Sequence, residues 1–294
     1  MALFVRFWGT RGSIPTPGPK TQRYGGNTSC VEIRSEKARI ICDGGSGLRE
    51  LGQELVREAN GKPLTLHMFF SHPHWDHIQG FPFFTPAYDA ANTLYVYGSG
   101  QDDHMHGLLS GQMEARYFPV SFVDLGARIL PGDFDGKKAK VHDVKIRRFR
   151  QQHPGGSAGY VFDAGGARVV YATDNELDLV IRDPGLPERD PEALRAFPSE
   201  VLEPFRGADL VIADAQYDDD EYAKKKGWGH ARATTALDLG IQAGAKRIAL
   251  FHHDPLQSDA DVEEKVRRCA ERAKRLGSEI VVFGAREGIT LKLP

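Results

Sequence analysis

Four side chains that commonly bind metal ions stand within six positions of this sequence, directly after an apolar segment. The segment is "LTLHMFF", residues 64–70, and "SHPHWDH" follows it with His72, His74, Asp76 and His77. Its length and composition predict a buried strand that ends where the polar cluster begins. His72 and His74 are two positions apart, so they can project to one side of an extended backbone. Imidazoles with a carboxylate suit Zn²⁺, and also Mn²⁺ or iron. The stretch therefore predicts a metal centre at the end of a β-strand.

A surface turn with chance histidines is the alternative interpretation, and four candidate ligands in six positions disfavour it. Asp76 and His77 come from the turn that follows, offset enough to serve a second ion. Two ions need more ligands than one turn supplies, so we expect partners at other strand ends. The candidates are His153 in "RRFRQQHPGG", Asp174 in "ARVVYATDNE", and His252 or His253 in "KRIALFHHDP". Because adjacent strand residues face opposite ways, only one of the last two should be a ligand.

Short strand-like segments and helical segments recur along the whole chain. Segments rich in Val, Ile, Phe and Tyr predict eleven strands, at residues 3–8, 30–33, 38–43, 64–70, 93–98, 144–149, 159–163, 167–174, 208–214, 246–251 and 279–284. "SGLRELGQELVREA" predicts a helix that buries Leu48, Leu51, Leu55 and Val56. Strands come both in consecutive pairs and in alternation with helices, which favours a mixed-sheet layered sandwich. We expect one domain over residues 1–294, with lid inserts near 98–136 and 176–203.

Composition narrows the class of protein. The chain has 294 residues, 40% of them hydrophobic, and a net charge of −2, which argues against broad electrostatic binding to nucleic acid or anionic membranes. Its three cysteines form no CxxC pair, which suits a reducing compartment. The first residues show neither a signal peptide nor a membrane span. We expect a cytoplasmic protein without a membrane partner.

Together these motifs resemble the metallo-β-lactamase fold, and within it the ribonuclease Z-like and cyclic phosphodiesterase branch. The resemblance extends over nearly the whole chain, through "GTRGSIP", "NTSC", "CDGGSG", "HPGGSAGY", "IADAQY" and "GWGHARATTALDLGIQAGAKRIALFH". It implies an α/β fold, an αββα sandwich of two mixed sheets flanked by helices with the metals at the edge between the sheets. It further implies His72, His74 and His153 on one ion, Asp76, His77 and His252 on the other, and Asp174 between them.

The resemblance also implies a mechanism, in which two divalent ions share a hydroxide that attacks phosphorus. Zinc is the first expectation, with manganese or iron as alternatives. We expect His230 in "WGHA" to donate a proton to the leaving group, with Asp214 orienting or charging it, and we count Asp76 with them as catalytic. The alternative for His230 is a neighbour of a helix N-terminus. Asp214 stands where the branch usually has glutamate, and Asp43 is expected to orient ligand histidines.

The connection between His153 and Asp174 bears on the substrate. The tRNA-processing members of the branch carry a long Gly- and Pro-rich arm there, whereas only 21 positions separate the two residues in this chain. We therefore expect a small phosphodiester, such as a cyclic nucleotide or another cyclic phosphate. The alternatives are an RNA-processing nuclease, with nucleic acid as a less favoured partner, and a lactonase or thioesterase. A binding module that has lost activity is also considered, and residues 176–203 are expected to form a lid or a homodimer contact.

Two other groups of residues receive a surface interpretation. His104 and His106 in "DDHMHG" resemble a second metal pair, but no further ligand supports them, so we expect a polar lid or surface segment. Tyr117 and Phe118 are expected to form either an aromatic wall over the site or an ordinary hydrophobic anchor.

Overall fold

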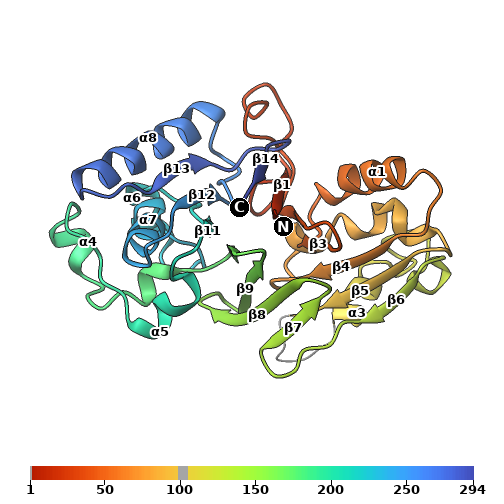
Figure 1. The fold of residues 1–294 in the computed structure, drawn as a ribbon. Coiled ribbons are helices and arrows are strands. Elements are labelled where there is room, and N and C mark those ends of the chain that lie inside the picture. Colours follow the sequence, from red (N-terminus) through yellow and green to blue (C-terminus); the bar gives the residue numbers. More distant parts are fainter. Residues whose placement is uncertain (1, 99–104) are drawn as a thin grey trace.

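The computed structural model describes residues 2–98 and 105–294 and contains two seven-stranded mixed sheets (Figure 1). The first has the order β14–β1–β2–β3–β4–β5–β6, with β1 (Phe4–Gly9), β2 (Cys30–Arg34), β3 (Arg39–Cys42), β4 (Thr65–Phe69), β5 (Thr93–Tyr97), β6 (Arg128–Pro131) and β14 (Thr290–Lys292). The second has the order β13–β12–β11–β10–β9–β8–β7, with β7 (Lys138–Val141), β8 (Val144–Gln151), β9 (Ser157–Ala164), β10 (Ala167–Ala172), β11 (Leu210–Asp214), β12 (Arg247–Phe251) and β13 (Val281–Gly284).

Helices cover the outer faces of both sheets. The longer ones are α1 (Leu48–Ala59), α3 (Met105–Gly111), α6 (Asp219–Lys225), α7 (Ala233–Gln242) and α8 (Asp259–Arg275). The short turns are α2 (Trp75–Ile78), α4 (Leu186–Arg189) and α5 (Ser199–Leu202), with 3₁₀ turns at Phe81–Phe83, Thr85–Tyr88, Phe122–Asp124, Leu177–Leu179 and Glu203–Phe205. In Figure 1, α1 lies outside the first sheet and α7 and α8 lie outside the second. This is the expected αββα sandwich.

Three apolar clusters hold the layers together. The central cluster lies between the sheets and includes Phe7, Phe69 and Phe251, all without solvent exposure. A second cluster packs α7 and α8 on the outer face of β10, β11 and β12, and a third packs α1 on the first sheet. Strand β11 is buried along its whole length because layers cover both of its faces, which explains the apolar sequence of its residues 210–213.

Helix α1 differs in one residue from the sequence prediction. Leu48, Leu51 and Leu55 are buried as expected, but the Val56 side chain is 42% exposed. Gly52 takes the remaining place on the buried face, one turn after Leu48, and Val56 lies at the edge of that face. Within the described ranges no helix is long and apolar enough to cross a bilayer.

The two expected inserts are packed against the body of the protein. In the first, Leu109, Met113 and Phe122 join the cluster beneath α1, and β6 forms an edge of the first sheet. In the second, Leu177 and Phe197 join the cluster on the outer face of the second sheet. Residues 99–104, which include His104, lie outside the described ranges.

Candidate metal centre

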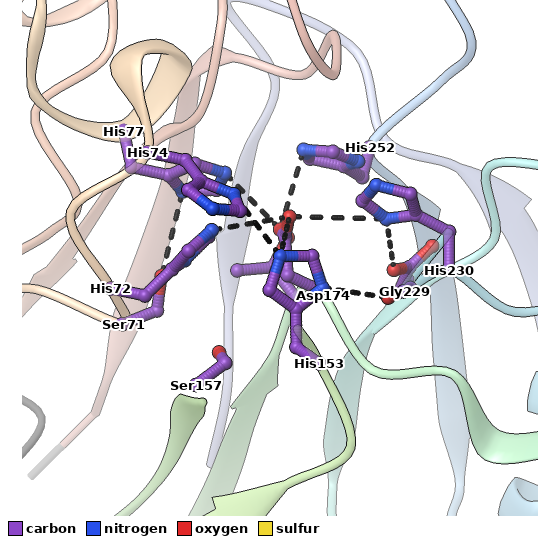
Figure 2. A network of polar contacts seen from close by, with 12 residues as sticks. Ser71, His72, His74, His77, His153, Ser157, Asp174, Gly229, His230 and His252 are labelled. Carbon is purple, nitrogen blue, oxygen red and sulfur yellow. Dashed lines mark hydrogen bonds and ion pairs between the residues drawn. The ribbon is translucent and has the colours of Figure 1, made fainter. Parts of the chain in front are cut away.

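The candidate ligands converge from the ends of strands. The 72–77 segment follows β4, His153 follows β8, Asp174 follows β10 and His252 follows β12. Strands β8, β10, β11 and β12 run in one direction, because β9 is antiparallel to β8 and β10 while β10, β11 and β12 are parallel. Their carboxyl ends therefore meet at one edge of the second sheet. Figure 2 shows the histidines gathered around Asp174 at this edge.

One group of possible ligand atoms belongs to His72, His74, His153 and Asp174, all within 4.8 Å of one another. Nε2 of His72 lies 3.6 Å, and Nε2 of His153 3.8 Å, from Oδ2 of Asp174. Nδ1 of His74 lies 3.1 Å from Nε2 of His153. The three histidines predicted to share one ion are thus brought to one place.

A second group contains Asp76, His77 and His252, again within 4.8 Å. Nε2 of His252 lies 3.0 Å from Oδ2 of Asp76, and Nε2 of His77 lies 3.2 Å from the same oxygen. His253 instead turns away and donates from Nε2 to the carbonyl oxygen of Ala285, 2.9 Å away. The structure therefore brings His252, and not its neighbour, to the cluster.

Asp174 lies between the two groups and presents a different oxygen to each. Its Oδ2 faces His72 and His153, while its Oδ1 lies 3.1 Å from Nε2 of His77 and 3.3 Å from Nε2 of His252. Burial by itself would raise the pKa of Asp174, but the surrounding histidines, His252 first, hold that pKa well below its ordinary value. A carboxylate in this position can contact two ions at once.

The backbone is strained where the site is assembled. Asp43, Asp174 and His252 adopt positive φ angles of 59°, 53° and 60°, and Ser13 beside them has a φ of 65°. Residues other than glycine rarely adopt this left-handed conformation, which costs about 1–3 kcal/mol. Its concentration here indicates that the fold holds these side chains in place for a function.

A further set of polar groups contacts Nδ1 of the candidate ligands His72 and His77, the ring nitrogen that faces away from the cluster. Asp43 accepts from Nδ1 of His77 at 2.7 Å, and also from the hydroxyls of Ser71 and Tyr171. Of the candidate ligands, it contacts only His77; Oγ of Ser71 lies 3.1 Å from Nδ1 of His72. Such contacts set the tautomer and orientation of a ligand ring.

Two of these outer contacts were missed by the sequence reasoning. Nδ1 of His252 lies 2.9 Å from Oε1 of Gln216, and the backbone N–H of Ser13 donates to Oδ2 of Asp76 at 2.7 Å. Gln216 follows β11, and Ser13 belongs to the "GTRGSIP" segment near the amino end. Both residues lie in segments that contributed to the family resemblance, "GTRGSIP" and "IADAQY", but neither was singled out.

His230 and Asp214 form a pair beside the cluster. Nδ1 of His230 lies 2.8 Å from Oδ2 of Asp214, which is fully buried at the end of β11. Asp214 also accepts from the backbone N–H groups of Asn175 and Gln216, which fix its orientation. Burial opposes a charge on His230, but Asp214, and then Asp174 and Asp76, outweigh it and raise the pKa of His230 to about 9. An imidazolium held in this way can donate a proton.

Glu176 positions the loop that carries His230, and the sequence reasoning did not identify it. Its buried carboxylate accepts from the N–H groups of Gly227 at 2.6 Å and Gly229 at 2.8 Å, and from the Tyr222 hydroxyl at 2.8 Å. The carbonyl oxygen of Gly229 in turn accepts from Nδ1 of His153 at 2.9 Å. Gly229 has a φ of 95°, and a Cβ there would lie 2.3 Å from Nδ1 of His153, so only glycine fits.

The unsatisfied atoms of the cluster match bound metal ions. Within the described ranges, Nε2 of His72 and Nε2 of His77 are buried without a hydrogen bond of acceptable geometry, although carboxylate oxygens lie 3.1–3.6 Å away. Buried nitrogen and oxygen atoms rarely remain unpaired. The two imidazole nitrogens therefore require a partner that lies between them and the carboxylate oxygens. The donor set of imidazoles and carboxylates suits zinc and related ions. The residues therefore fit divalent metal ions.

The remaining sequence-predicted residues lie away from this cluster. His106 packs against Phe122, with ring centroids 4.5 Å apart, and Phe118 packs against Phe83 at 5.4 Å. Tyr117 is 66% exposed. No contact joins any of these three side chains to the candidate ligands in the described structure. The surface and anchor interpretations fit His106 and Phe118.

The chain is similar to known proteins in both sequence and fold. The family model described as "Beta-lactamase superfamily domain" matches residues 38–253. The chain is 26% identical to the ribonuclease Z of Natronomonas pharaonis, over 89% of this chain and 92% of that protein. It is 24% identical to the ribonuclease Z of Haloarcula marismortui, over 86% of each.

Solved structures share the fold at lower sequence identity. The metallo-β-lactamase fold protein YhfI from Bacillus subtilis has a TM-score of 0.69 at 18% identity, with 99% of both chains covered. A diphosphatase from the PhnP family has a TM-score of 0.66 at 15% identity, covering 99% of this chain and 98% of that one. Yeast PDE1 has a TM-score of 0.65 at 16% identity, with 99% of both chains covered.

Proposed function

This chain belongs to the β-lactamase superfamily, and we propose that it is a metal-dependent phosphodiesterase that hydrolyses a small phosphodiester, such as a cyclic nucleotide or another cyclic phosphate. It is a hydrolase of that superfamily. Its ribonuclease Z relatives, and a fold neighbour called a diphosphatase, carry names of enzymes that act on phosphate compounds. The observation that carries the proposal is the His230–Asp214 pair. Its ligand atoms form a third possible metal-binding group with Asp174 and His252, next to the two groups assigned to the ions.

In this proposal the protein holds two divalent ions, zinc first and manganese or iron as alternatives. His72, His74 and His153 hold one ion, Asp76, His77 and His252 hold the other, and Asp174 contacts both. The separate oxygens that Asp174 presents to the two groups support this assignment. Bound there, two divalent ions would polarise the phosphoryl oxygens and lower the pKa of an attacking water molecule.

The chain's own residues supply orientation and a proton. Asp214 accepts from Nδ1 of His230, and Nε2 of that ring has no hydrogen-bond partner among the described residues. His230 donates its proton from Nε2 to the leaving oxygen, which would otherwise depart as a strongly basic alkoxide. Asp43 and Gln216 keep His77 and His252 in fixed orientations throughout. A thioesterase expels a weakly basic thiolate, so it would leave the His230–Asp214 pair without a comparable role.

The preference for a small substrate rests on the connection between His153 and Asp174. Strands β9 and β10 and their two-glycine turn occupy it almost entirely, so no arm that could hold a large RNA emerges there. Two exposed indoles support a nucleotide. Trp75 is 66% and Trp228 63% exposed, and they are chain neighbours of His74 and Gly229, which both contact His153. An exposed aromatic ring beside the site can stack on a base.

RNA cleavage is a second candidate, and it is favoured by the ribonuclease Z relatives, which align over most of their own length.

Hydrolysis assays on metal-analysed protein test the proposal. We expect turnover of bis(p-nitrophenyl) phosphate and of at least one cyclic nucleotide or cyclic phosphate, with two metal ions per chain. Faster turnover of a short RNA than of every small phosphodiester would favour the second candidate. A fully metal-loaded protein that hydrolyses no phosphodiester would refute both.

A further inference from the structure

Lys265 stands on the buried face of helix α8, where an apolar residue would be expected. This face consists of Val262, Lys265, Cys269, Arg272 and Ala273, and their spacing of three and four positions is that of a helix packed on a core. Lys265 is only 4% exposed. Burial lowers the pKa of its ammonium to about 8, so the group is still mainly charged at neutral pH. A buried charge is costly unless its contacts compensate, which directs attention to those contacts.

The ammonium of Lys265 makes three hydrogen bonds, one for each of its N–H groups. It donates to the carbonyl oxygen of Ala215 at 2.6 Å, to that of Gln216 at 3.1 Å, and to Oε1 of Gln257 at 2.8 Å. No ion pair joins it to a carboxylate among the described residues. All three partners are neutral oxygens, so the contact does not serve to neutralise an acidic group. It holds two successive carbonyl groups of the chain at one point.

These two carbonyl groups belong to the loop that leaves β11 toward the candidate metal centre. Oε1 of Gln216 accepts from Nδ1 of His252 at 2.9 Å, and the backbone N–H of Gln216 donates to Oδ1 of Asp214 at 3.1 Å. Asp214 in turn pairs with His230. Gln216 therefore contacts both a candidate ligand and the partner of the proposed proton donor, while Lys265 binds its backbone carbonyl.

Gln257 adds a second connection to the same loop. Its Nε2 donates to the carbonyl oxygen of Gln216 at 3.3 Å and to Oε2 of Glu221 at 2.7 Å, and its own carbonyl oxygen accepts from Nη1 of Arg11 at 2.7 Å. Lys265→Met would keep most of the side-chain volume but remove a donor from three buried residues. Buried acceptors that lose their donor carry the full cost of their desolvation. The loop would then relax toward other donors and shift Gln216.

We propose that Lys265 is a positioning residue for the ion assigned to Asp76, His77 and His252, and that it acts by holding the peptide of Gln216 so that Oε1 of Gln216 meets Nδ1 of His252. Lys265 touches no candidate ligand itself. The inference rests on the metal assignment made in the proposed function. It concerns retention of an ion and not the substrate, so it holds for any phosphodiester that the protein hydrolyses.

The arrangement concerns one of the two ligand groups. In the described structure no hydrogen bond joins Lys265 or Gln216 to the ligands of the other ion, which are His72, His74 and His153. The two groups also differ in access to water, because His74 is exposed whereas Asp76, His77 and His252 are buried. We therefore expect a chelator to remove the ion of the buried group in the slower of two phases, and Lys265 to affect that phase alone.

Release of zinc from the zinc-loaded full chain tests the proposal. An excess of a colorimetric zinc chelator is mixed with the wild type, Lys265→Met, Gln216→Met and the double variant. Lys274→Met removes an exposed lysine from the same helix and is the matched control. We expect the slow phase to accelerate about tenfold or more in Lys265→Met and in Gln216→Met, and to stay unchanged in the control. The double variant should release zinc no faster than Gln216→Met, because effects that pass through one residue do not add.

The same measurements contain the results that would overturn the proposal. These are a wild-type release rate in Lys265→Met, equal acceleration of both phases, or effects that multiply in the double variant; the last two would show general loosening of the fold. Should Lys265→Met fail to fold, Lys265→Gln retains an amide donor without the charge, and a wild-type slow phase in that folded variant would equally overturn the proposal. Hydrolysis of bis(p-nitrophenyl) phosphate is measured separately. A wild type that binds two zinc ions and hydrolyses nothing would refute the proposed function and leave the role of Lys265 standing.

Discussion

The carboxylate of Glu176 accepts a hydrogen bond of 2.8 Å from the backbone N–H of Gly229, and through that residue it links the candidate ligand His153 to His230. Gly229 precedes His230 in the chain, and its carbonyl oxygen accepts from Nδ1 of His153. One buried side chain thus orients a candidate ligand and positions the proposed proton donor.

Replacement of Glu176 tests this positioning role. Glu176→Gln would turn an amide N–H₂ toward N–H or O–H donors, so we expect kcat to fall about 10–100-fold while KM changes little. The metal content of Glu176→Gln, measured by elemental analysis, should be close to that of the wild type. Glu36→Gln, at an exposed position, is the control. Unchanged kcat in Glu176→Gln would show that the loop holds its position without this carboxylate.

Asp174→Ala is expected to lose metal and activity together. The substitution removes the only carboxylate that faces both histidine groups in the described structure, which leaves the histidines of each group without a shared anionic partner. Metal stoichiometry by elemental analysis should fall from two ions per chain to one or none. A variant that keeps two ions would contradict the assigned position of Asp174.

His230→Ala is expected to keep its metals and lose turnover. The loss should be about 10²–10⁴-fold for a cyclic nucleotide, whose alkoxide leaving group needs a proton. It should be much smaller for bis(p-nitrophenyl) phosphate, because p-nitrophenolate is a weak base and leaves without protonation. Equal losses on the two substrates would argue against the proton-donor role, and two retained ions would exclude a ligand role.

Gly12 fits against His252 with no room for a side chain. A Cβ at residue 12 would lie 2.4 Å from the imidazole, so Gly12→Ala must displace the ring. We expect weaker binding of the ion assigned to Asp76, His77 and His252, seen as a lower metal stoichiometry after dialysis. Gly107→Ala in α3 meets no atom within 4 Å and is the control. Equal metal retention by both variants would contradict the assignment of His252.

A buried charge network ties residues 176–203 to the helices of the second sheet. Asp238 on α7 forms ion pairs with Arg195 and Arg272, and all three side chains are almost completely buried. Asp238→Ala would leave two buried guanidinium groups without this partner, so we expect the free energy of unfolding to fall by about 3–5 kcal/mol. Urea denaturation measures the change. A loss below about 1 kcal/mol would show that water or Asp219 compensates Arg195.

The sequence by itself determined much of the fold and the composition of the candidate site. Eleven of the strands were predicted because each one buries apolar side chains, and the spacing of those side chains can be read directly from the sequence. Strands β6, β7 and β14 were missed, since each is only three or four residues long and lies at an edge with little buried apolar area. The sequence also identified the 72–77 segment and the polar residues that follow β8, β10 and β12. A polar side chain directly after an apolar strand can be recognised without the structure.

Only the tertiary structure decided how these side chains meet. It gave Asp174 a position in which each oxygen faces a different group of histidines, and it turned His252 inward and His253 outward. It also recruited Glu176 and Gln216, whose contacts with residues 36 to 53 positions away along the chain leave no local pattern. A hydrogen bond between distant segments depends on the packing of two sheets and their loops. Short sequence segments therefore show which ligand types the site contains, whereas the positions of those ligands depend on the packing of the layers.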